Sequence, residues 1–173
     1  MIKNIFFLLC IVLLLSCKNR QTGEPENNNA NRAGQVFTPV QLNQKVIDLE
    51  NSMAEPILKA EAEIKVRSQN GNMEGVVQSA KAIEDSIQLR IDELNKISPV
   101  GVNGADFKLI ATRYFEYMKS IYTTYKEIAL AKDDAEKSAK AKQMESIIKA
   151  QADVVSNLQQ AQQKYATENG FVY

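Results

Sequence analysis

The chain has 173 residues, with 21 basic and 21 acidic side chains, so its formal net charge is zero. It contains no His, which excludes a His general base and a His metal ligand, and its low Gly content, seven residues, argues against a phosphate-binding glycine loop. Nucleic-acid-binding proteins carry a basic excess, and this chain has none. We therefore expect no metal, no cofactor and no nucleic-acid partner. The length of the chain suits a single domain.

The first residues have the composition of a secretory signal. Lys3 supplies a basic start, and an unbroken apolar run follows from Ile5 to Leu15. A membrane-spanning helix needs roughly 20 apolar residues, so this run is too short to be one. Its length is that of the apolar region of a signal peptide. We predict a signal peptide over residues 1–16.

The apolar run ends in Leu14-Leu15-Ser16-Cys17. This tetrapeptide resembles the lipobox of bacterial lipoproteins. The resemblance implies cleavage between Ser16 and Cys17 and lipidation of Cys17, through which the mature protein would be anchored to a membrane. Since Cys10 would leave with the signal peptide, no disulfide is expected. In many Gram-negative lipoproteins an Asp after the Cys marks the protein for retention in the inner membrane, and here Lys18 stands at that position. The resemblance therefore implies the outer membrane facing the periplasm, with the cell surface as second choice.

Residues 17–36 are expected to be the lipidated Cys and a disordered tether. The segment 18–35 reads KNRQTGEPENNNANRAGQ and holds no aliphatic side chain larger than Ala. Such a composition cannot bury enough apolar surface to fold. As a flexible coil it would span about 20 to 25 Å.

Residues 37–173 are predicted to form one all-α domain. Thr38, Pro39 and Gln41 together make a helix start, with a capping box and Pro at the first helical position. The spacing of apolar residues then predicts four long amphipathic helices over about 39–69, 73–97, 104–131 and 134–168. Because the connections are short, the helices should be antiparallel neighbours in an up-down-up-down four-helix bundle. A coiled-coil dimer that pairs or exchanges helices is the alternative, so we expect a monomer or a homodimer.

Three features modify this simple pattern. Pro56 should kink the first helix near Ser52, because it removes a backbone donor. The turn between the third and fourth helices is placed at 132–134, where Asp133 can cap a new helix with Glu136 as its partner. Gln151 is a polar member of the apolar seam of the fourth helix and is expected to set its register.

The third helix holds four of the six Tyr. Aromatic residues at helical spacing are most often core, with hydroxyls reaching the rim. Two functional hypotheses are the alternatives to this core role. Tyr114 and Tyr125 could line a ligand cavity between helices, or Phe115 and Tyr122, on the flank of the core face, could form an exposed docking patch.

The start of the fourth helix is basic, through Lys132, Lys137, Lys140, Lys142 and Lys149. We interpret it as a solvated face, with attraction to anionic lipid or sugar phosphate as the alternative. The carboxylate pairs at 84/85, 92/93 and 133/134 are sequence neighbours that do not face one another on a helix, so they predict no acid/base pair and no catalytic residue is assigned.

A lipobox, a polar tether and a helical body together resemble the small helical lipoproteins of Gram-negative envelopes. This likeness is architectural and implies no active-site residue. Our first hypothesis is a non-enzymatic, lipid-anchored binding or structural module with an envelope protein as partner. The alternatives are a carrier of an apolar small ligand in the bundle core and an enzyme with an unrecognised site.

Overall fold

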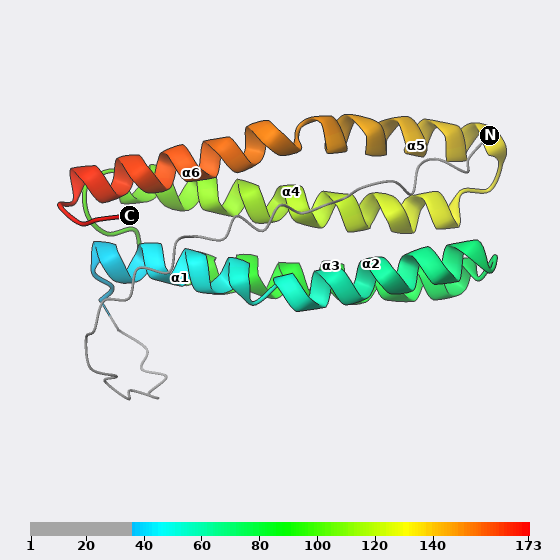
Figure 1. The fold of residues 1–173 in the computed structure, drawn as a ribbon, viewed down its shortest axis with the longest axis horizontal. Coiled ribbons are helices and arrows are strands. Elements are labelled where there is room, and N and C mark those ends of the chain that lie inside the picture. Colours follow the sequence, from blue (N-terminus) through cyan, green and yellow to red (C-terminus); the bar gives the residue numbers. More distant parts are fainter. Residues whose placement is uncertain (1–35) are drawn as a thin grey trace.

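The structure is a computed structural model that describes residues 36–173. The predicted signal peptide, Ser16, Cys17 and nearly all of the predicted tether lie outside the described residues. Within residues 36–173 every regular element is a helix, as predicted (Figure 1). The helices are α1 (Pro39–Asn51), α2 (Ala54–Gln69), α3 (Met73–Asn95), α4 (Gly104–Leu130), α5 (Asp134–Lys149) and α6 (Gln151–Glu168).

These helices are arranged as four long rods. α1 and α2 run end to end as one rod, and α5 and α6 as another, while α3 and α4 are each continuous (Figure 1). α3 packs against α2 and α4, α4 packs against α5 and α6, and α6 returns to contact α1. Short loops join successive rods, so each lies antiparallel to the next, which is the geometry of a helical bundle.

The first helix begins as the sequence predicts. The Thr38 Oγ1 accepts a hydrogen bond from the Gln41 N–H at 3.3 Å, and the Gln41 side chain accepts the Thr38 N–H at 2.9 Å. Two N–H groups that a helix start leaves free are therefore satisfied, and Pro39 occupies the position where its missing N–H costs nothing.

The predicted kink before Pro56 is present as a break between α1 and α2 at Ser52 and Met53. Pro56 has no N–H to give to the Ser52 carbonyl, which leaves the chain free to turn there. The Ser52 hydroxyl donates to the Leu49 carbonyl at 2.7 Å and accepts from Arg90 Nε at 3.0 Å. The break is therefore held to α3 and places the fully buried Met53 in the core.

The prediction of one uninterrupted helix over 134–168 was wrong, because Ala150 separates α5 from α6. In an unbroken helix the Ile147 carbonyl would accept the N–H of Gln151. Here it accepts the Tyr117 hydroxyl of α4 at 3.0 Å and the Ala150 N–H at 3.1 Å. A side chain that enters the hydrogen-bond ladder is a recognised cause of a helix break.

The remaining boundaries differ little from expectation. α3 ends at Asn95, two residues earlier than predicted, and α4 ends at Leu130. The turn before α5 is confirmed: Asp133 caps the helix by accepting the Glu136 N–H at 2.8 Å. Glu136 in turn accepts the Lys132 N–H at 2.9 Å.

Aromatic rings fill the end of the bundle where α4 begins and α6 ends. The Tyr165 ring stacks on Phe107 at 4.5 Å and meets Phe171 edge-on at 5.9 Å between centroids. The Tyr165 hydroxyl donates to the Val100 carbonyl at 2.6 Å. The chain after α6 thus folds back on the bundle, and the Tyr173 hydroxyl donates to Gln162 at 2.7 Å.

Candidate functional site

The aromatic residues of α4 are the functional candidates that lie within the described residues. Phe115 and Tyr122 were expected to form an exposed docking patch, and this prediction was wrong: their side chains are 0% and 1% exposed. α4 has neighbours on several sides, α3, α5 and α6 among them, so residues on the flank of its core face are covered as well. Tyr114 is also buried, whereas Tyr125 is half-buried.

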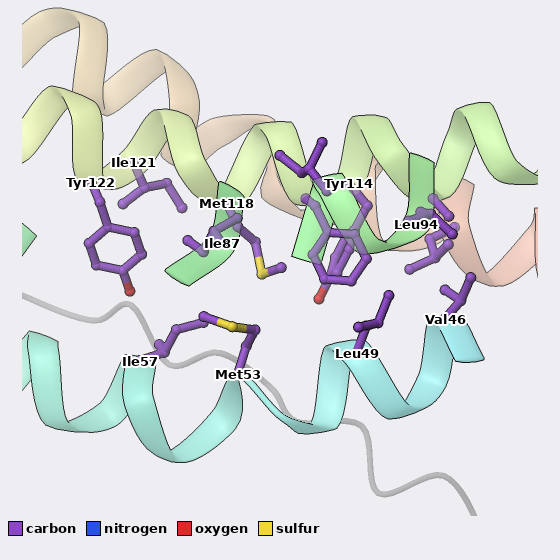
Figure 2. Packing of buried hydrophobic residues seen from close by; sticks show 14 of the residues in the cluster. Val46, Leu49, Met53, Ile57, Ile87, Leu94, Tyr114, Met118, Ile121 and Tyr122 are labelled. Atoms are coloured by element: carbon purple, nitrogen blue, oxygen red, sulfur yellow. The ribbon is translucent and has the colours of Figure 1, made fainter. Parts of the chain in front are cut away.

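Two of these tyrosines bind carboxylates on the rod formed by α1 and α2. The Tyr114 hydroxyl donates to Glu50 Oε1 at 2.8 Å, and the Tyr122 hydroxyl donates to Glu61 Oε1 at 3.3 Å. Both hydroxyls point toward that rod in Figure 2. The two hydrogen bonds lie on either side of the break at Ser52 and Met53 and join both halves of the broken rod to one continuous helix.

The side chains between these two tyrosines close the core. Met53 and Ile57 reach up from the α1 and α2 side, where they approach Met118 from α4 and Ile87 from α3 (Figure 2). All four are buried. Tyr114 therefore lies in packed core, with its hydroxyl already engaged by Glu50.

The structure divides the four candidate residues into two groups. Tyr114 meets Phe115 edge-on at 5.6 Å between ring centroids. Tyr122 meets Tyr125 at 6.2 Å, with Glu61 beside them. The sequence places Tyr114 and Tyr125 on one helix face, but it gives no sign of the two glutamates that separate their environments.

Burial shifts the pKa values of both tyrosine–glutamate pairs. Burial raises the pKa of Glu61 to about 7, against a smaller lowering by the Tyr122 hydroxyl. Burial also raises the pKa of Glu50, which the Tyr114 hydroxyl opposes. The pKa values of Tyr114 and Tyr122 are both raised, first by burial and then by the neighbouring carboxylates. Both hydroxyls therefore stay protonated and act as donors.

A different set of polar contacts joins α3 to α4. Glu84 accepts hydrogen bonds from Thr123 at 2.8 Å and from Lys126, and Lys119 Nζ donates to Gln88 at 2.7 Å. Burial acts to raise the pKa of Glu84, but these hydrogen bonds and the nearby positive charge hold it below its usual value.

Beside these contacts lies an open groove of about 460 Å³, which sequence reasoning missed. It is lined by Gln88, Ile91, Asn95, Glu116, Lys119, Ser120, Thr123, Thr124 and Gln143. Ile91 belongs to the apolar core and Thr124 is also buried. Most of the other lining residues are polar and flank the apolar seams of three helices, so the sequence pattern predicts only that they face solvent.

The carboxylate pairs along the chain are separated by their partners. Asp85 binds Lys81, while its sequence neighbour Glu84 binds Lys126 on α4. Glu93 binds Lys45 of α1 and Arg90. Among residues 36–173 no group of three or more Asp, Glu, Cys or His side chains is placed to hold a metal ion.

Large apolar side chains are exposed on two parts of the molecule. One is the outward face of α2, where Leu58 and Val66 lie two turns apart. The other is the end of the bundle at which α1 begins, with Val36, Val40, Val102, Val172 and Tyr173. Leu89, Leu109 and Leu130 are exposed singly.

None of the helices in the described part of the chain is long and apolar enough to cross a bilayer. No family model, curated protein or solved structure matches the chain.

Proposed function

We propose that the protein is a lipid-anchored component of a bacterial cell envelope and that its helical bundle is a non-enzymatic binding or structural module. The observation that carries this proposal is the tetrapeptide Leu14-Leu15-Ser16-Cys17, directly after an apolar run of signal-peptide length. Several acyl chains on Cys17 would give stable anchoring, since a single chain holds only marginally. The outer membrane, facing the periplasm, is the proposed location.

The helical domain supports a module in preference to a carrier. The side chains around Tyr114 are buried, and its hydroxyl is held by Glu50. The exposed Leu58 and Val66 on α2 offer an apolar face for an envelope protein partner. No contact in the described residues specifically favours a carrier of apolar ligands.

The anchor is tested by metabolic labelling of cells with a clickable palmitate analogue, followed by purification of the protein. The wild-type chain should incorporate the label and begin at Cys17 after processing. Replacing Cys17 with Ala should abolish labelling, because the thiol that receives the lipid is gone. Cys10→Ala is the matched control, since Cys10 lies inside the apolar run, and it should label like the wild type. Label that persists in the Cys17→Ala variant would overturn the proposal.

Native mass spectrometry of residues 36–173 distinguishes the hypothesis of a binding or structural module from the hypothesis of a carrier. A bare monomer is the expected result. A retained small molecule would favour the carrier, and a dimer would favour the coiled-coil arrangement in which helices are paired or exchanged.

A further inference from the structure

One end of the bundle gathers exposed apolar side chains from three separate parts of the chain. Val36 and Val40 lie at the start of α1, Val102 in the loop between α3 and α4, and Val172 and Tyr173 after α6. All five are more than half exposed. Single exposed apolar residues are ordinary, but exposed apolar residues that three distant segments bring to one end of the bundle make that end a candidate interaction surface.

Specific contacts hold these three segments together. The Asn169 side chain accepts the Val102 N–H at 2.8 Å and donates to the Val102 carbonyl at 3.1 Å, which ties the loop to the end of α6. A Cβ at Gly101 would lie 2.8 Å from Pro39, so the start of α1 is packed against the same loop. Figure 1 shows the three segments meeting at one end of the bundle. We name Val36, Val40, Val102, Val172 and Tyr173 the apolar end.

The apolar end is also the end at which the predicted tether joins the domain. The described chain starts at Val36, and residues 18–35 join it to Cys17. If Cys17 is lipidated, this is the end of the domain through which the anchor is attached. The basic start of α5 lies at the other end of α4, about 40 Å away at 1.5 Å per residue.

The chemistry of the apolar end suits the interface of a neutral lipid surface. Its side chains are aliphatic apart from Tyr173, whose hydroxyl donates to Gln162, six residues before the end of α6, so this ring is directed back along the bundle. Glu168, the nearest acidic residue of α6, accepts a hydrogen bond from Asn103 and pairs with Lys164 at 3.9 Å. Asp106 in the first turn of α4 and Lys96 at the end of α3 are both exposed at this end of the bundle, and their opposite charges offset each other. The attraction would therefore be apolar and only weakly dependent on salt.

We propose that the apolar end inserts its exposed side chains into the interfacial layer of the bilayer that carries the lipid anchor, so that the bundle stands end-on with α5 directed away from the membrane. This inference rests on the proposed lipid anchor, and the following experiment separates the two.

The test uses the absence of Trp from the whole chain. Full-length lipidated protein is purified with a single reporter, Val102→Trp or Val172→Trp, and is reconstituted into phosphatidylcholine vesicles. A parallel sample uses phosphatidylcholine brominated on its acyl chains, which quenches Trp fluorescence at close range. Both reporters should lose fluorescence in the brominated vesicles, and high salt should leave this loss unchanged.

The matched control is Leu130→Trp, at the opposite end of α4. Leu130 is 60% exposed and Val102 is 56% exposed, so both reporters start from similar surface positions. Leu130→Trp should retain its fluorescence, which also shows that Trp does not draw any surface into the bilayer.

Vesicle flotation in the same samples separates the two proposals. Protein that floats with the vesicles but shows no quenching at positions 102 and 172 would overturn the end-on contact and leave the anchor standing. If emission at these positions is instead blue-shifted without quenching, the apolar end is covered by protein, and the contact is likewise overturned. Lipid-labelled wild-type protein that fails to float would overturn both the anchor and the contact. Equal quenching at position 130 would overturn the end-on orientation.

Discussion

At the scale of the residue, two glutamates at similar positions on amphipathic helices have pKa values shifted in opposite directions. Glu61 lies beside two tyrosines of α4, where burial raises its pKa to about 7. Glu84 is held by Lys126 and Thr123, and its pKa is lowered. Both are flanking positions of amphipathic helices, so the difference comes from what the neighbouring helix presents. Glu61 should therefore weaken the fold when ionised, whereas Glu84 should strengthen it.

The Glu61 environment predicts a pH dependence of stability. Its pKa is about 7 in the fold and 4.5 at its usual value, so the folded state favours the protonated form. The stabilising contribution is fully present below pH 4.5 and is lost as the pH rises through 7. Because the side chain is partly exposed, we expect a loss of about 1 kcal/mol in the free energy of unfolding between pH 5 and pH 8.

Replacing Glu61 with Gln should remove this contribution, because the amide still accepts the Tyr122 hydroxyl but cannot ionise. Urea denaturation followed by circular dichroism at pH 5 and pH 8 measures the change. Glu61→Gln should be more stable than the wild type at pH 8 and should vary less between the two pH values. Glu55→Gln, at an exposed position of the same helix, should follow the wild type. A wild-type slope retained in Glu61→Gln would contradict the assignment.

At the scale of the element, two of the four rods are broken, for different reasons. The break between α1 and α2 has its cause in the chain itself, since Pro56 withholds a donor from Ser52. At the Ala150 break the Ile147 carbonyl accepts the Tyr117 hydroxyl of α4, and we expect this contact from outside the helix to be the cause. The first break should therefore persist whatever α3 and α4 present, whereas the second should depend on one hydroxyl group.

Tyr117→Phe tests the second cause. Without the hydroxyl, the Ile147 carbonyl becomes free to accept the Gln151 N–H, and the helix can close across Ala150. The Gln151 amide should then exchange with solvent more slowly, as measured by NMR-detected hydrogen exchange. One hydrogen bond replaces another, so the free energy of unfolding should change by less than about 1 kcal/mol.

Tyr125→Phe is the control, because Tyr125 is half-buried on the same helix and pairs with Tyr122 through its ring. It should leave exchange of the Gln151 amide unchanged. Unaltered exchange in Tyr117→Phe would show that the break has another origin.

At the scale of the whole molecule, the bundle has one continuous core. A single cluster of buried apolar side chains runs from Leu42 and Phe107 at one end to Ile64 and Met144 toward the other. The two tyrosine–glutamate pairs connect opposite rods across this core. The bundle should therefore unfold as one cooperative unit, and damage at its centre should lower the stability of every helix.

Ile87→Ala tests this cooperativity. Ile87 is fully buried in the middle of α3 and lies near Met53 and Met118 (Figure 2). Truncation leaves a cavity that costs about 2 to 5 kcal/mol of unfolding free energy. Leu89→Ala, at a position 58% exposed on the same helix, should stay within about 0.5 kcal/mol of the wild type. Circular dichroism and tyrosine fluorescence should report the same transition midpoint, and separate midpoints would indicate independent parts.

The sequence by itself determined the helical class, the start of α1, the kink before Pro56 and the turn at Asp133, because each depends on residues within a few positions of one another. Apolar periodicity likewise predicted most of the core. Only the tertiary structure decided that Phe115 and Tyr122 are buried, that Glu50 and Glu61 accept hydrogen bonds from tyrosines of α4, and that the Tyr117 hydroxyl binds the Ile147 carbonyl of a distant helix. It also brought five exposed apolar residues from three segments to one end of the bundle. These outcomes depend on which side chains face one another across rods far apart in sequence, and periodicity along one helix carries no information about the surface of its neighbour.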